Sequence, residues 1–397
     1  MDETRPDWQP DPMKPGTPII PQAEWYLPPY NRWTFQHVSE MTPTTPIWRG
    51  SGPVLPLPER ITDIGGIEFE LAGRRSTVRE FLDSSFTDGF LILSRGEVIA
   101  ETYMNGLKPH RHHLAMSMSK SIVGAVCGIL VHRGLIDTGS PVTQYLPELE
   151  TTAYRGATVQ QVLDMSTGVM ITKPYTEPGT HAYMLFQAAG WRPLDYPEHP
   201  QTTWQLILML TELQRPHGAL FEYRSAESNV LGFILQRVTG MPLADLISTE
   251  LWAPMGAERD AYITVDPGGF PSADAGFNAT LRDYARFALL HLRGGRLHGA
   301  QIVPSEWIEE TRKGNHDLLQ GGDRVELPRG AYHNQFWIED PERRGFMCVG
   351  HGGQWIYIDP ETDFAAVKLS SWPDAEMDRY VETLAAIRAI RDACAVR

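Results

Sequence analysis

The fold is decided by the stretch Met116-Ser-Met-Ser-Lys-Ser-Ile-Val-Gly-Ala-Val-Cys-Gly-Ile-Leu-Val-His132. Its apolar residues occur almost all round a helical repeat, which predicts a buried, central helix over Ser119–His132. Ser117 precedes this helix, where backbone N–H groups and the helix dipole stabilise developing negative charge. Lys120 lies on the same face one turn along. Because apolar neighbours lower the pKa of an ammonium group, this lysine could take the serine proton.

The alternative interpretation of the same residues is a capping serine followed by a surface lysine. A lysine inside so apolar a helix needs a reason, which favours the catalytic interpretation. The sequence lacks the His-Glu-x-x-His metalloprotease motif, the phosphate-binding Gly-x-x-x-x-Gly-Lys motif and the dinucleotide Gly-x-Gly-x-x-Gly motif. It also lacks a Gly-x-Ser-x-Gly nucleophile elbow. His110-Arg-His-His113 matches no metal-site spacing, and we expect a solvated loop there.

Two hairpins are predicted, one on each side of a helical region. Phe90–Ser94 and Val98–Tyr103 are joined by the turn Arg95-Gly-Glu97. Near the end of the chain, Trp355–Ile358 and Phe364–Leu369 flank Asp359-Pro-Glu-Thr-Asp363, and a helix over 375–394 follows. We expect the hairpins to form one antiparallel sheet, covered by the C-terminal helix and the helix after residue 119.

The region between the hairpins is predicted to be mostly helical. The expected helices are Ser119–His132, Val159–Met165, Thr202–Leu213, Ser228–Gly240 and Leu281–Leu292, with a further one at Val78–Leu82 before the first hairpin. The fold class is therefore α+β, an antiparallel sheet flanked by helices with an inserted, mostly helical domain. We predict a proline-rich wrapping arm with little regular structure at 1–60, a sheet domain from 61–130 and 340–397, and the helical domain at 131–339.

Composition narrows the function classes. The chain has 397 residues, of which 42% are hydrophobic and 21% charged, so it can bury a sizeable core. Its formal net charge of −14 argues against nucleic acid or an anionic membrane as the main partner. The three cysteines fit neither a disulfide framework nor a structural zinc site. With no apolar leader in the sequence, the expected location is cytoplasmic.

Further candidate residues lie in two loops and a glycine-rich segment. Tyr223, beside Ser225 and just before a predicted helix, could relay a proton, although a half-buried packing tyrosine is the alternative. Tyr175 lies in the turn Lys173-Pro-Tyr-Thr-Glu-Pro178, from which it could reach a pocket. Gly350-His-Gly-Gly353 precedes a strand and could bring a backbone N–H close to a ligand, or simply form a bulge.

Together these motifs resemble the serine β-lactamase/penicillin-binding-protein family. Ser117-x-x-Lys120, Tyr223-x-Ser225 and the glycine segment occur in the order and near the spacings of that family. The strongest resemblance is to the 6-aminohexanoate-dimer (nylon-oligomer) hydrolases and related carboxylesterases. It is carried by Pro28–Trp33, Met116–Ser121, Pro141–Glu148, Val162–Met165, Ala189-Gly-Trp191, Arg237–Gly240 and Val367–Asp374.

The resemblance implies the roles of the site residues. Ser117 would be the acyl-forming nucleophile, Lys120 its base and Tyr223 the general acid and base. Tyr175 would donate a hydrogen bond to the substrate or leaving group. The oxyanion hole would use the N–H of Ser117 and that of His351, or of Gln354 if the glycines are matched differently. Phe186, Trp191, Ser225 and Gly350 would contact the substrate.

The sequence departs from the family pattern at three places. Ser225 stands where penicillin-binding enzymes have asparagine, and Cys348 or His351 stands where they have a lysine that holds a substrate carboxylate. These two departures argue against β-lactamase or peptidase activity. The nylon-dimer hydrolases carry an acidic residue, which suits an amine-bearing dimer, at the place where this sequence has Phe186. We therefore expect a more apolar pocket and a preference for uncharged esters or amides.

The sequence accordingly predicts a serine hydrolase that cleaves small carboxylic esters or amides through an acyl-enzyme. Neither a metal nor an organic cofactor is required. The expected partner is a small-molecule substrate rather than a nucleic acid or a membrane, with a homodimer left open. The alternatives are an acyl-binding sensor that does not turn over, a true β-lactamase or DD-peptidase, and a metal hydrolase that uses the histidines at 110–113.

Overall fold

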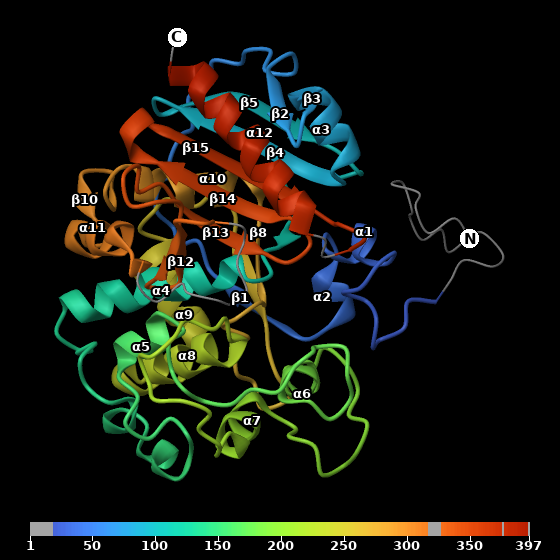
Figure 1. Ribbon diagram of the computed structural model, residues 1–397. Helices are drawn as coiled ribbons and strands as arrows, with labels where there is room; N and C mark the ends of the chain where they lie inside the picture. The colour runs from blue at the N-terminus through green and yellow to red at the C-terminus, as the bar shows by residue number, and fades with distance from the viewer. Residues whose placement is uncertain (1–18, 317–326, 375–376, 396–397) are drawn as a thin grey trace.

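A computed structural model describes residues 19–316, 327–374 and 377–395 of the chain (Figure 1). Its largest sheet has seven antiparallel strands in the order β11-β12-β13-β14-β15-β4-β5. In that order the strands are β11 (Ala331–His333), β12 (Phe336–Ile338), β13 (Phe346–Gly350), β14 (Gln354–Asp359), β15 (Phe364–Ser370), β4 (Thr87–Ser94) and β5 (Glu97–Tyr103). The predicted hairpins, β4–β5 and β14–β15, are adjacent in one sheet, as expected.

Turn chemistry fixes the first hairpin. Arg95 and Gly96 both have positive φ, 52° and 81°. Two left-handed residues in succession match the right-handed twist of the flanking strands. The register pairs Ser94 with Glu97. The short polar turn between two apolar runs was therefore sufficient to predict this element.

Side-chain alternation divides the sheet into two buried faces. Leu91 and Leu93 of β4 belong to one apolar cluster, and Phe90 and Ile92 belong to another. The second cluster includes Ile387 and other residues of α12 (Met377–Ala395), which crosses one face in Figure 1. The opposite face is covered mainly by α10 (Leu281–Leu292). α4 (Met118–His132) packs along β12, β13 and β14, so the expectation that it covers this face is only partly right.

The sheet also includes residues assigned above to the helical region. β11 and β12 come from 331–338, before the expected boundary at residue 340. Each strand has only three residues, which is too short for the alternation that reveals a strand in a sequence. Two small antiparallel pairs accompany the sheet: β2 (Glu68–Leu71) with β3 (Arg74–Thr77), and β9 (Arg296–Leu297) with β10 (Ala300–Gln301).

The N-terminal arm is more regular than predicted. It forms two short helices and strand β1 (Thr44–Ile47), which pairs with β7 (Ala261–Thr264). The resulting four-stranded sheet has the order β1-β7-β8-β6 and includes β8 (Phe277–Ala279) and β6 (His113–Leu114). The two arm helices are α1 (Asn31–Thr34) and α2 (Val38–Met41). These elements were not predicted because each is short and lies in a proline-rich segment, where no long periodic run of apolar residues marks it.

Helices fill the region between the hairpins. Besides α4 and α10, they include α5 (Val159–Leu163), α6 (His181–Ala188), α7 (Thr203–Met209), α8 (Ser225–Thr239), α9 (Leu243–Ile247) and α11 (Ser305–Lys313). A further helix, α3 (Val78–Ser84), precedes the first hairpin. α3, α5, α7 and α8 correspond to predicted helices, with ends that differ by a few residues, and α10 has the predicted bounds. α8 begins at Ser225 rather than Ser228. No single described helix is long and apolar enough to cross a membrane. One bent pair, Ser225–Thr239 with Leu243–Trp252, reaches the required length and apolar composition only when its two parts are counted together.

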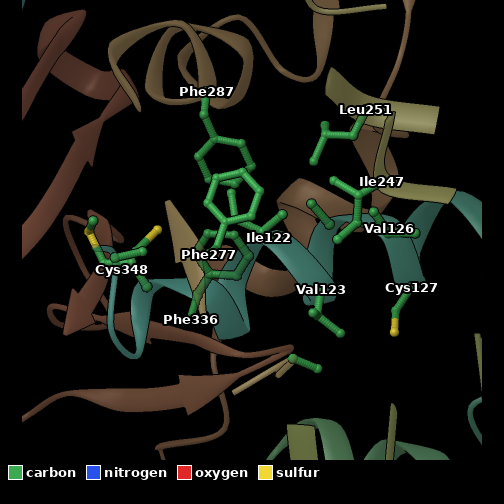
Figure 2. Close-up of a cluster of buried hydrophobic side chains, with 14 of the residues drawn as sticks. Ile122, Val123, Val126, Cys127, Ile247, Leu251, Phe277, Phe287, Phe336 and Cys348 are labelled. Atoms are coloured by element: carbon green, nitrogen blue, oxygen red, sulfur yellow. The ribbon is translucent and has the colours of Figure 1, made fainter. Parts of the chain in front are cut away.

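α4 is the centre of the larger apolar cluster. Every residue from Met118 to Leu130 is buried. Figure 2 shows Ile122, Val123 and Val126 of α4 among side chains from β8, β12, α9 and α10. Burial of this kind contributes about 1.5–3 kcal/mol for each large apolar side chain. The helix that carries the candidate nucleophile is thus fixed on all sides.

Candidate active site

Ser117 and Lys120 lie within hydrogen-bond distance of each other. Ser117 is the N-cap residue of α4, and Met116 before it has a left-handed φ of 47°. Lys120 Nζ donates to Ser117 Oγ at 2.9 Å and to the backbone carbonyl of Asp274 at 2.7 Å. The predicted spacing of one helical turn therefore brings the amine to the hydroxyl, and the Asp274 carbonyl fixes its direction.

The environment of Lys120 makes it a usable base. Its side chain is fully buried, and this loss of hydration lowers the pKa from 10.5 to about 8, although the negative charge of Asp274 acts in the opposite direction. The ammonium group also lies 5.2 Å from the centre of the Tyr223 ring. Near neutral pH a fraction of the molecules therefore carries a neutral amine that can accept the Ser117 proton.

Tyr223 lies beside the Ser117 hydroxyl. The Tyr223 and Ser117 side chains share a hydrogen bond, and burial raises the tyrosine pKa far above its ordinary value. The Tyr223 ring stacks on Trp337 of β12, with centroids 5.6 Å apart and planes at 18°. A phenol that stays protonated can pass on its own proton while it receives another.

An ion pair between a buried arginine and a partly exposed glutamate fixes the loop that carries Tyr223. The next residue, Arg224, is fully buried and donates to the Thr167 carbonyl at 2.9 Å and to Glu222 Oε2 at 2.7 Å. Buried charges need such partners because an unpaired charge carries a large desolvation penalty. The loop geometry thus depends on residues on both sides of the tyrosine in sequence.

The glycine segment approaches the backbone just before Ser117. A Cβ atom on Gly350 would lie 2.3 Å from the carbonyl oxygen of Ala115, so only glycine fits this contact. Gly350 and His351 line the same cavity as Ser117. Gln354 is fully buried, and its amide exchanges hydrogen bonds with the backbone of Ser370. Of the two oxyanion candidates, His351 is the one on the cavity wall.

A cavity of about 690 Å³ opens at Ser117. Most of the candidate residues chosen from the sequence line this cavity, whereas Lys120 is not among the lining residues. Those lining it are Ser117, Tyr175, Phe186, Trp191, Tyr223, Ser225, Gly350 and His351. This volume suits a small organic molecule.

The cavity wall also includes residues that sequence reasoning missed. Tyr26 and Leu27 come from the arm, Asp274 and Arg192 from loops, and other residues from β12 and α12. The Tyr26 ring stacks on Phe186, with centroids 4.7 Å apart and planes at 4°. None of these positions has a local motif, because each reaches the site only through the tertiary fold. The only sequence feature near Tyr26 that pointed to the family was the segment Pro28–Trp33 of the arm.

The structure shows the surroundings of Cys348 and of the histidines at 110–113. Cys348 on β13 is buried, and its burial raises the thiol pKa to about 12, so the group stays a neutral thiol. The histidines before α4 have separate partners. The expected solvated loop is wrong for His113, which is fully buried in β6 and pairs with Asp88 at 2.9 Å, while the His112 ring bonds to the carbonyl of Asp260. Within the described parts of the chain, no group of three potential ligand side chains converges on one point.

The fold and this constellation define a class of protein: a serine hydrolase in which a lysine and a tyrosine lie beside the candidate nucleophile. The chain belongs to the β-lactamase family, whose model, described as "Beta-lactamase", matches residues 75–390. It is thus a β-lactamase-fold serine hydrolase, related to a 6-aminohexanoate-dimer hydrolase.

Individual relatives support this placement. The chain is 38% identical over 364 residues to the 6-aminohexanoate-dimer hydrolase of Paenarthrobacter ureafaciens, covering 91% of this chain and 90% of the relative. A solved structure from Bacillus anthracis, assigned provisionally to the same hydrolases, is 28% identical with a TM-score of 0.85, covering 95% and 96% of the two chains. A family VIII carboxylesterase shares the fold, with a TM-score of 0.58, 18% identity and coverage of 79% and 96%.

Proposed function

We propose that this protein hydrolyses small carboxylic esters or amides through an acyl-enzyme on Ser117, as a carboxylesterase or as a hydrolase of the 6-aminohexanoate-oligomer type. The observation that carries the proposal is the 2.9 Å contact between Lys120 Nζ and Ser117 Oγ at the wall of the cavity. A lysine whose pKa is lowered to about 8 by burial can activate the hydroxyl without any further group.

The proposed steps follow from the positions of these groups. Neutral Lys120 takes the Ser117 proton as Oγ attacks the substrate carbonyl carbon. The N–H groups of Ser117 and His351 would hold the oxyanion that forms. Tyr223 passes a proton to the leaving alcohol or amine, with Tyr175 as a further hydrogen-bond donor. Water then attacks the acyl carbon and gives up a proton to Tyr223 or Lys120. As the acyl–Oγ bond breaks and the acid forms, a proton from the same pair returns to Ser117 Oγ, which restores the hydroxyl, the neutral amine and the phenol.

The cavity walls support the substrate class. Phe186 stacks on Tyr26, so an aromatic ring, rather than a carboxylate, occupies the place that would suit an ammonium group. The buried Cys348 offers no cation for the carboxylate of a β-lactam. These contacts favour esters and amides without an amine over both the amine-bearing dimer and β-lactams.

The test is a substrate panel on the wild type and on Ser117→Ala. It contains p-nitrophenyl esters of short acids, 6-aminohexanoate dimer and a chromogenic β-lactam. We expect hydrolysis of the short esters and a loss of about 10³-fold or more in kcat on removing the hydroxyl. Ser84→Ala is the matched control, because among the described residues Ser84 Oγ bonds only to the carbonyl of Phe81, at 3.4 Å. Strong β-lactam turnover, or full activity in Ser117→Ala, would contradict the proposal.

Mass spectrometry separates the hydrolase from a sensor that acylates without turnover. A hydrolase releases acid continuously, whereas a sensor stops after one equivalent and retains the added acyl mass on Ser117. The cytoplasmic location and the homodimer stay predictions.

A further inference from the structure

The cavity wall has more cationic than anionic side chains among the described residues. Among the described residues that line it, Lys173 and Arg192 are cationic and Asp274 is anionic. Lys173 Nζ lies 3.9 Å from a carboxylate oxygen of Glu222, and Asp274 lies next to Lys120. Within the described residues no acidic side chain comes within 4.0 Å of Arg192. Asp195 hydrogen-bonds to the Tyr183 side chain on which Arg192 stacks, without forming an ion pair with Arg192 within that distance. Among the described residues the Arg192 guanidinium group is therefore a cation on the wall without a direct carboxylate partner.

Arg192 is anchored beside the aromatic part of the wall. Its backbone N–H donates to the carbonyl of Phe186 at 3.3 Å. The guanidinium carbon lies 4.0 Å from the centre of the Tyr183 ring. Stacking of this kind occupies the face of the guanidinium group and leaves its N–H edges available for hydrogen bonds. No acceptor for those N–H groups is found in the part of the chain that the structure describes.

Tyr26 provides a second donor at the same place. Its ring is fixed against Phe186, and Trp25 before it donates from Nε1 to the Trp191 carbonyl at 3.0 Å. Burial raises the Tyr26 pKa to about 12, against the opposing effect of the Arg192 charge, so the phenol stays protonated. The Tyr26 hydroxyl has no hydrogen-bond partner among the described residues. A neutral and a cationic donor thus border one apolar surface.

We propose that the wall formed by Tyr26, Phe186 and Arg192 binds a carboxylate at the far end of an apolar chain. The preferred substrates would then be esters or amides that carry an anionic group remote from the bond that is cleaved. A planar guanidinium group suits a planar carboxylate, and the aromatic rings suit the methylene chain that joins it to the scissile bond. This inference rests on the proposed function, since it names the substrate class of the same site.

The experiment compares matched substrates that differ only at the remote end. One series consists of p-nitrophenyl esters of hexanedioic acid, of its monoamide and of 6-aminohexanoic acid. A second series places the carboxylate or carboxamide on the leaving group instead. In the wild type we expect kcat/KM for the carboxylate to exceed that for the carboxamide by about tenfold or more in at least one series, with the ammonium ester slowest. The preference should shrink as salt is added.

The variant Arg192→Gln tests the assignment. The carboxylate-to-carboxamide ratio should fall to about one, and because the ratio is internal to each variant, a general loss of activity does not change it. Arg133→Gln, an exposed arginine paired with Glu250, is the control and should keep the wild-type ratio. A ratio near one in the wild type, or one that Lys173→Gln abolishes and Arg192→Gln does not, would overturn the inference. Ser117→Ala tests the proposed function separately, since it removes cleavage of every ester alike.

Discussion

In the proposed mechanism, Lys120 decides whether the Ser117 hydroxyl can react. An exposed lysine would be almost fully protonated at neutral pH and could not accept a proton. Complete burial in α4 removes its hydration, while the Asp274 carbonyl and the Tyr223 ring keep some stabilisation of the charged form. The result is an amine whose pKa of about 8 lies close to working pH, where a general base is most effective.

A pH profile tests this reasoning. Because the neutral form of Lys120 is the active one, kcat/KM for a neutral p-nitrophenyl ester should rise about tenfold per pH unit below the pKa of about 8, and level off above it. The corresponding Lys120→Arg variant should be inactive throughout, since a guanidinium group stays protonated. A flat wild-type profile between about pH 6 and pH 9 would show that Lys120 is not the base.

Tyr223 is the second residue with a testable role. Removing its hydroxyl in Tyr223→Phe keeps the stack on Trp337 but deletes the hydrogen bond to Ser117. If Tyr223 transfers protons, kcat should fall by about 10²-fold or more, measured under saturating ester. Tyr332→Phe is the control, since Tyr332 packs edge-on against Tyr223 without lining the cavity. Near-wild-type turnover in Tyr223→Phe would remove it from the mechanism.

At the level of elements, local patterns predicted the parts with strong periodicity. The hairpins β4–β5 and β14–β15 combine alternating apolar residues with short polar turns, and α10 has a helical repeat with Thr280 as its N-cap. Strands β1, β11 and β12 have three or four residues each and give no such signal. β1 depends on a partner distant in the sequence, β7, whereas β11 pairs with the neighbouring β12.

The contact between β13 and the segment before α4 leads to a prediction about Gly350. A methyl group there would lie 2.3 Å from the Ala115 carbonyl oxygen and 3.0 Å from Gln354 Cβ. Because one of these neighbours is backbone, Gly350→Ala must push β13 away from the start of α4, at a stability loss of about 1–3 kcal/mol. Urea unfolding should measure this loss, together with a lower kcat.

Gly52→Ala is the matched control for that experiment. No atom lies within 4 Å of a Cβ built on Gly52, and its φ is not left-handed. Its stability should stay within about 0.5 kcal/mol of the wild type. Equal stability of the two variants would mean that β13 and the segment before α4 can separate freely, contrary to the close packing described here.

On the scale of the whole molecule, the site is assembled from distant segments. The contact between Ser117 and Lys120 could be predicted because both lie on one helical turn, and the position of Tyr223 at the site because it stands beside Ser225 before a helix; their catalytic roles stay predictions. Asp274 could not be predicted, since its contribution to Lys120 is a backbone carbonyl whose identity the sequence does not encode. Tyr26 could not be predicted either, because the arm must fold back across the molecule to reach Phe186.

The arm is held in this position by a buried ion pair, which gives the last prediction. Arg32 of α1 donates to Asp88 Oδ1 at 3.0 Å, to the Phe86 carbonyl at 3.0 Å and to Ser371 Oγ at 2.8 Å. Asp88 is fully buried. In Arg32→Ala its charge would lose its arginine partner, which should destabilise the fold by about 3–5 kcal/mol in urea unfolding. Arg133→Ala, which breaks an exposed pair with Glu250, should lose at most about 1 kcal/mol.

If Arg32→Ala loosens the arm, the catalytic constants should change as well, because the same segment supplies Tyr26 to the cavity wall. In Arg32→Ala, kcat/KM for bulky p-nitrophenyl esters should change relative to that for the acetate, since the acetate needs little of the wall around Tyr26. Tyr26→Ala should shift the ratio in the same direction while leaving the Arg32–Asp88 pair in place. If Arg32→Ala were as stable as Arg133→Ala and kept the wild-type ratio, the arm would be a passive covering and the cavity would owe its shape to the rest of the fold.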